Sequence, residues 1–155
     1  MVGPAAEHDL LFHKQHHAGA EVLRNGGFVG NGIVEPHQRW ATGLLVEDTT
    51  VTAMPGSTPG STDLLDRGSD GSGQGWAIGW GVIWNGSANQ FTIQRPPGSE
   101  NWCIGCSGTQ ATTAPPGGST VLPQGAIDSS GTYVFPYSLY QAQLTQRLGQ
   151  SVMAQ

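Results

Sequence analysis

Large and small residues alternate in a five-residue phrase that occurs three times along the chain. The copies are residues 40–44 (WATGL), 76–80 (WAIGW) and 102–106 (WCIGC). Because the side chains of a strand point alternately to its two faces, each copy predicts a strand with large residues on one face and small residues on the other. Self-similarity at intervals of about 20–50 residues is typical of solenoids, in which repeats bury their apolar faces against each other. The pattern therefore favours stacked parallel strands over unrelated strands of a β-sandwich.

This interpretation divides the chain into three parts. Residues 1–20 form a histidine-rich segment, residues 21–131 the coils of a parallel β-solenoid, and residues 132–155 a C-terminal capping helix and tail. Within the coils we expect Trp40, Trp76 and Trp102 to stack inside, on adjacent strands. In the last part, Tyr140, Leu144 and Leu148 recur at every fourth position and Gly149 follows, as in an amphipathic helix with a glycine end. We expect this helix to cap or flank the end of the solenoid and to shield its last coil.

Composition narrows the function classes. Only 11% of the 155 residues are charged, and 24 are glycine. Five tryptophans and four phenylalanines argue against disorder, since disordered chains lack such apolar anchors. The net charge of −5 argues against a nucleic-acid partner, which normally needs a basic surface. No apolar run approaches the length of a membrane span, and the N-terminus lacks the basic and apolar regions of a signal peptide.

Metal and redox sites have weak signals. His13 and His17 are spaced like zinc ligands on a helix, but no glutamate lies between them as in HExxH, so we expect a solvated or partner-covered segment. We expect no cofactor, with calcium held by three aspartates as the one alternative left open. They are Asp63, Asp66 and Asp70, in and beside a glycine-rich loop that lacks two ligands of an EF-hand.

Two shorter motifs also have structural interpretations. Cys103 and Cys106 are three residues apart on a predicted strand, so their side chains should face opposite ways. We therefore expect two reduced thiols without a shared metal. Asn85 begins an Asn-Gly-Ser sequence, which is both a glycosylation sequon and a turn signal, and we favour the turn.

Ionisable residues gather at one point of this weakly charged chain. Residues 35–39 (EPHQR) place an acid, an imidazole and a guanidinium directly before the first phrase. This cluster has two interpretations, both open: a turn whose polar groups bind the backbone, or a functional site. Arg67 and Arg95 each precede a later copy of the phrase, so stacking should bring them close together.

Several groups of residues, taken as a set, carry a resemblance to a known family. They are 36–43 (PHQRWATG), 67–68 (RG), 71–77 (GSGQGWA), 84–85 (WN), 96–98 (PPG), 101–106 (NWCIGC), 138–140 (SLY), 143–144 (QL) and 147–149 (RLG). The chain resembles the C-terminal part of poorly characterised right-handed parallel β-helix proteins of the pectin-lyase-like superfamily, found in bacteria and fungi. The resemblance implies an all-β, right-handed parallel β-helix of a few coils with a short C-terminal α-helix, secretion to the extracellular space, and action on polysaccharide. Gln38 and Gln74 stand where such relatives usually carry histidine. The family's usual N-terminal coils are missing, so the chain looks like a fragment.

Two functions compete. The first is a polysaccharide lyase that acts on a uronic acid polymer by β-elimination, which needs a neutralised carboxylate and a base. Its candidate residues are His37 or Arg39 as the base, Glu35 to orient His37, Arg67 and Arg95 to clamp substrate carboxylates, and Trp84 and Gln74 as further substrate contacts. The second is a non-catalytic surface or structural solenoid that binds glycan or a partner chain, including self-association through an open solenoid end. The expected partners are thus an acidic polysaccharide or another glycan.

Overall fold

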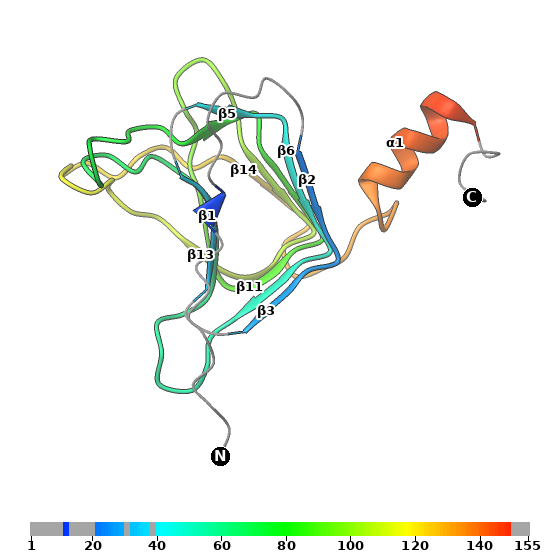
Figure 1. The fold of residues 1–155 in the computed structure, drawn as a ribbon, viewed down its shortest axis with the longest axis horizontal. Coiled ribbons are helices and arrows are strands. Elements are labelled where there is room, and N and C mark those ends of the chain that lie inside the picture. The colour runs from blue at the N-terminus through cyan, green and yellow to red at the C-terminus, as the bar shows by residue number, and fades with distance from the viewer. Residues whose placement is uncertain (1–10, 13–20, 30–31, 38–39, 150–155) are drawn as a thin grey trace.

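The structure is a computed structural model that describes residues 11–12, 21–29, 32–37 and 40–149. Short strands make up most of its regular structure, and one helix follows near the C-terminus (Figure 1). The strands are β1 (Leu11–Phe12), β2 (Glu21–Arg24), β3 (Gly27–Val29), β4 (Ile33–Pro36), β5 (Ala41–Thr42), β6 (Leu44–Glu47), β7 (Thr50–Thr52), β8 (Ser61–Leu64), β9 (Ile78–Gly79), β10 (Val82–Trp84), β11 (Ser87–Ile93), β12 (Trp102–Ile104), β13 (Ser107–Ala111) and β14 (Ala126–Asp128). The helix is α1 (Leu139–Leu148).

Every pairing between these strands is parallel, and the paired strands are never consecutive in the chain. One sheet has the order β14-β12-β10-β6-β2, a second joins β5 to β9, and the third has the order β1-β4-β8-β11-β7-β3 with β13 also paired to β11. The third sheet curls, because β11 pairs with β7 near its start and with β8 further along. The predicted parallel, predominantly β architecture with a short C-terminal helix is confirmed.

The core lies between the five-stranded sheet and the curled sheet (Figure 1). On the five-stranded sheet, register partners from five successive strands form one ladder: Leu23, Val46, Ile83, Cys103 and Ile127. The curled sheet contributes Val34, Val51, Leu64 and Phe91, which are all buried. Burying a side chain of this size stabilises the fold by about 1.5–3 kcal/mol. The ladder explains why a strand of only three or four residues is sufficient in each layer.

A turn in left-handed conformation follows each strand of the five-stranded sheet. The turn residues are Asn25 (φ 52°), Asp48 (φ 47°), Asn85 (φ 53°), Gly105 (φ 70°) and Ser129 (φ 51°). Glycine and the short polar residues Asn and Asp tolerate this conformation best, which accounts for four of the five. The turn interpretation of Asn85 is confirmed. Its side chain is only 1% exposed, and its amide donates to the carbonyl oxygens of Val134 and Tyr137.

The predicted alignment of the three phrases is wrong. The first two lie in neighbouring strands, but Ala41 pairs with Ile78 and not with Ala77, so their register is shifted by one residue. The third phrase belongs to the five-stranded sheet, where Trp102 pairs with Val82 and Ala126. Trp102 also faces away from the core, because its neighbour Cys103 is the residue that points inward and is completely buried.

The prediction of two reduced cysteines is also wrong, because Cys103 and Cys106 form a disulfide. Strand β12 ends at Ile104, and Gly105 turns the chain with a φ of 70°. Alternation of side chains therefore stops before Cys106, and both sulfur atoms enter the core. The two Cα atoms lie 5.8 Å apart, within the ordinary range for a disulfide.

The helix forms as predicted but lies elsewhere. Ser138 caps its start by accepting from the backbone N–H of Gln141, and Gly149 ends it. The contacts at its start are with β2 and β6, on the outer side of the five-stranded sheet, and α1 lies beside that sheet (Figure 1). The helix start therefore contacts β2 and β6, whereas we expected the helix at the last coil. None of the helix residues is fully buried.

Candidate functional site

Four of the predicted site residues come together beside the curled sheet. Glu35 lies in β4 and His37 follows it, while Arg67 precedes the glycine-rich loop 68–75 and Gln74 lies near its end. The guanidinium of Arg67 forms an ion pair with Glu35, and its Nε donates to the side-chain oxygen of Gln74. The side-chain nitrogen of Gln74 lies 3.0 Å from Nε2 of His37. The fold thus brings Glu35, His37 and Arg67 together, although Arg67 lies about 30 residues further along the chain.

The glycine-rich loop closes over this cluster because of two local features. The backbone N–H of Arg67 donates to Gly75, and that of Gly75 to Gly68, so the loop begins and ends at one point. Gly71 has a φ of 55°, and a Cβ there would lie 2.7 Å from the side-chain nitrogen of Gln74. The absence of a side chain at residue 71 lets Gln74 fold back, where it is 6% exposed.

Arg67 is committed to partners within the fold. Its three groups meet Glu35, Gln74 and Asp70, the last at 3.6 Å, and its side chain is 12% exposed. Arginine clamps a carboxylate through a pair of parallel N–H groups, and here no such pair faces solvent. The geometry therefore shows Arg67 joining β4 to the loop, and its expected role as a substrate clamp stays a prediction.

The remaining predicted site residues are dispersed. Arg95 is exposed, and among the described residues no polar contact joins it to the Arg67 cluster. Trp84 lies in β10, on the outer face of the five-stranded sheet, and its indole N–H donates to Pro136 at 2.8 Å. Trp84 is partly exposed, and its expected contact with a sugar stays a prediction. Arg39 lies outside the described residues.

The three aspartates considered for calcium have separate partners. Asp63 accepts from Ser61 and from the backbone N–H of Thr92, Asp66 caps the backbone N–H of Gly68, and Asp70 meets Arg67. Within the part of the chain that the structure describes, no group of three or more His, Cys, Asp or Glu is placed to hold a metal ion. His8, His13, His16 and His17 lie outside the described residues.

The buried carboxyl of Asp63 gives a prediction for acid pH. Burial raises the pKa of Asp63 above its ordinary value, although hydrogen bonds from Ser61 and Thr92 oppose the shift. The folded state therefore binds this proton more tightly than the unfolded state, and the stabilisation it gives is full at low pH and is lost as the pH rises through the folded pKa. Asp63→Asn is expected to flatten the pH dependence of the free energy of unfolding in that window, and to leave stability at pH 7 equal or higher. Urea unfolding between pH 4 and pH 7 measures this, and parallel curves for the two proteins would contradict it.

A pocket that sequence reasoning missed lies where the five-stranded sheet meets the segment before α1. Its volume is about 460 Å³, and it is lined by Arg24, Asn25, Asp48, Asn85, Tyr133, Tyr137, Ser138 and Gln141. We call this the arm pocket and residues 132–138 the arm. Its walls come from three of the left-handed turns, from the arm, from the end of β2 and from the first turn of α1. The signal in the sequence is faint: Asn25 and Asn85 are each followed by glycine directly after a strand.

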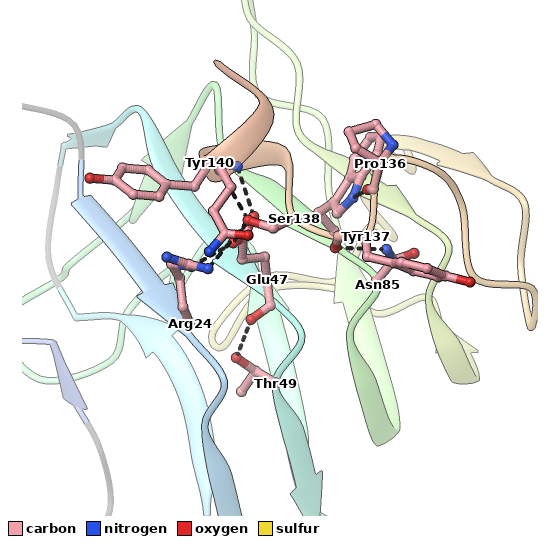
Figure 2. A network of polar contacts seen from close by, with 10 residues as sticks. Arg24, Glu47, Thr49, Asn85, Pro136, Tyr137, Ser138 and Tyr140 are labelled. Atoms are coloured by element: carbon pink, nitrogen blue, oxygen red, sulfur yellow. Dashed lines mark hydrogen bonds and ion pairs between the residues drawn. The ribbon is translucent and has the colours of Figure 1, made fainter. Parts of the chain in front are cut away.

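A buried carboxylate holds the arm in place. Glu47 is completely buried on the outer side of β6, and Figure 2 shows Arg24, Ser138 and Tyr140 around it. It accepts from Nε of Arg24 at 2.7 Å, from the hydroxyl of Ser138 at 2.6 Å and from the backbone N–H of Tyr140 at 3.0 Å. The Arg24 guanidinium also lies 5.1 Å from the centre of the Tyr140 ring. The position of the arm pocket is thus fixed by charge-assisted bonds rather than by packing alone.

Comparisons with protein families, with curated proteins and with solved structures found nothing that matches this chain. The described part of the chain also contains no helix with the length and apolar character needed to cross a membrane.

Proposed function

We propose that this chain is a right-handed parallel β-helix from an extracellular protein, and that it binds a glycan without catalysing a reaction. The coil architecture is supported by the parallel pairing of strands from successive passes of the chain and by the stacked left-handed turns. The location is supported by the disulfide between Cys103 and Cys106, since such bonds persist in oxidising compartments.

The arm pocket carries the proposal of glycan binding. Tyr133 and Tyr137 are 54% and 64% exposed, so both rings offer an apolar face with a hydroxyl at its edge. Around them stand Asn25 and Gln141, whose amides both donate to and accept from hydroxyl groups, and Asp48, whose carboxylate accepts from them. A sugar ring has the matching chemistry, with C–H bonds on its faces and hydroxyl groups around its edge.

The charges favour a neutral glycan. Arg24 is already paired with Glu47, and Asp48 adds a negative charge to the pocket wall. Arg67, which would have neutralised a uronic acid, is held by Glu35 and Asp70. β-Elimination requires that the carboxylate of the sugar be neutralised before a base removes the proton. The hypothesis of a polysaccharide lyase and the hypothesis of an acidic polysaccharide partner both depend on a free Arg67, so we favour neither.

Tyr137→Ala tests the proposal. Calorimetry with β-1,4-linked hexasaccharides of glucose, mannose and xylose, and with oligogalacturonate, is expected to show binding of a neutral chain by the unaltered protein. The variant should bind that chain about tenfold more weakly, equivalent to about 1.4 kcal/mol. Val121→Ala, at a residue that is 56% exposed and outside the pocket, should bind as the unaltered protein does. Absence of saccharide binding, or equal affinity of Tyr137→Ala, would overturn the proposal.

A further inference from the structure

Two tryptophan rings, those of Trp80 and Trp102, meet near the start of the five-stranded sheet, and a third, Trp40, lies against the residue before Trp80. Trp40 and Trp80 are 48% and 49% exposed, and Trp102 is partly exposed. The rings of Trp80 and Trp102 lie 5.8 Å apart between centroids, at an angle of 32°. The ring of Trp40 lies against Gly79, where a Cβ would be 2.7 Å from Cζ2 of the indole. We call Trp40, Trp80 and Trp102 the aromatic surface.

Trp80 occupies a backbone position that suits glycine. Its φ is 63°, in the left-handed region, where a bulky side chain is strained. Leu45 pairs with Val82, so the residue equivalent to Trp80 in the neighbouring strand is Gly43, with a φ of 69°. Half of the Trp80 side chain is exposed, so burial does not account for a tryptophan here. A large ring is kept at a strained position on the surface, which indicates that the exposed ring has a use.

The aromatic surface and the arm pocket lie at opposite ends of the same outer face. Trp102 begins β12 and points outward, while Asn85 of the pocket follows β10, the strand paired to β12. Three residues of strand separate the two ends, which corresponds to about 10 Å. A short linear molecule that lies along the strands therefore reaches from one to the other.

We propose that the aromatic surface is a second contact area for the glycan, and that the ligand is a linear neutral polysaccharide that occupies both areas at once. This inference rests on the proposed function of the arm pocket. Indole rings present a flat apolar face to the C–H bonds of a sugar ring, and about half of the surface of Trp40 and of Trp80 is accessible. The three indole rings of the aromatic surface are uncharged, so they suit the same neutral chain that the pocket does. Two linked contacts on one chain raise its affinity beyond that of either alone.

Trp80→Gly tests this inference, because it removes the ring and also relieves the strained backbone. The thermal midpoint should stay the same or rise, which separates a loss of binding from a loss of folding. With the neutral β-1,4-linked sugar that binds best, the unaltered protein should bind the hexasaccharide at least tenfold more tightly than the trisaccharide. In Trp80→Gly this gain should fall to less than threefold, while trisaccharide affinity stays unchanged. Trp40→Ala should reduce the gain in the same direction.

The controls separate this inference from the proposed function. Val29→Ala removes an apolar side chain from β3 at a residue that is 76% exposed, more than Trp80, and should leave both affinities unchanged. If the unaltered protein binds both saccharides but shows no gain with length, or if Trp80→Gly retains the gain, the aromatic surface is not a glycan contact, although the arm pocket is. If the unaltered protein binds neither saccharide, the proposed function fails and this inference fails with it.

Discussion

Replacing Glu47 with alanine is expected to lower the free energy of unfolding by about 3–5 kcal/mol, the usual effect of removing one partner from a buried ion pair. Glu47 is completely buried, and the variant leaves Arg24 without its carboxylate. The hydroxyl of Ser138 and the N–H of Tyr140 lose their acceptor at the same time. Urea unfolding followed by circular dichroism measures the loss, and proteolysis should cut residues 132–149 faster in the variant.

Asp48→Asn is the matched control for this prediction. It removes one negative charge from the next residue of the chain, which is exposed, and asparagine keeps the left-handed turn at φ 47°. Its stability should stay within about 0.5 kcal/mol of the unaltered protein, as for most surface substitutions. If Glu47→Ala were no more than about 1 kcal/mol less stable, Glu47 would not be what holds the arm, and a well-defined arm pocket would lose its basis.

The stacking of parallel strands could be predicted, because large and small residues alternate in each copy of the five-residue phrase as they do in a strand. The register in which these strands pair could not be predicted. A single pass of the chain contains several short strands, and the same pattern of a large residue followed by a small one suits more than one sheet. Residues 40–44 and 76–80 therefore meet in the small sheet, whereas Trp102 lies in the five-stranded sheet. The prediction of reduced cysteines failed for a related reason. Gly105 turns the chain between the end of β12 and Cys106, and this turn stacks with the equivalent turns after the neighbouring strands.

The candidate site was predicted in part. Scarcity of charge marked Glu35, His37 and Arg67 correctly as residues with a special environment, and the fold brings them together. Whether a guanidinium serves a substrate or the fold depends on how the loop 68–75 closes, which the sequence pattern does not specify. The arm pocket was beyond prediction, because its walls come from turns far apart in the chain and from the arm, whose position depends on one buried carboxylate.

Arg67 gives the second prediction of large effect, which distinguishes a structural role of this residue from a role in binding substrate. Arg67→Ala leaves Glu35 as a buried carboxylate without its cation and should lower the free energy of unfolding by about 3–5 kcal/mol. The double variant Glu35→Ala, Arg67→Ala should be less destabilised than the sum of the two single changes, since neither charge is then left alone. Urea unfolding of the four proteins gives this coupling directly.

Arg67→Lys completes the argument, because it keeps the charge and loses the planar group. An ammonium cannot meet Glu35, Gln74 and Asp70 in the geometry of a guanidinium, so we expect a loss of about 1–2 kcal/mol in stability. A substrate clamp would instead give a folded protein of nearly unchanged stability with weaker retention on polygalacturonate. Because Arg67 is held within the fold, retention of the folded Arg67→Lys protein should equal that of the unaltered protein. Weaker retention at unchanged stability would restore the lyase hypothesis and remove the case for a purely structural Arg67.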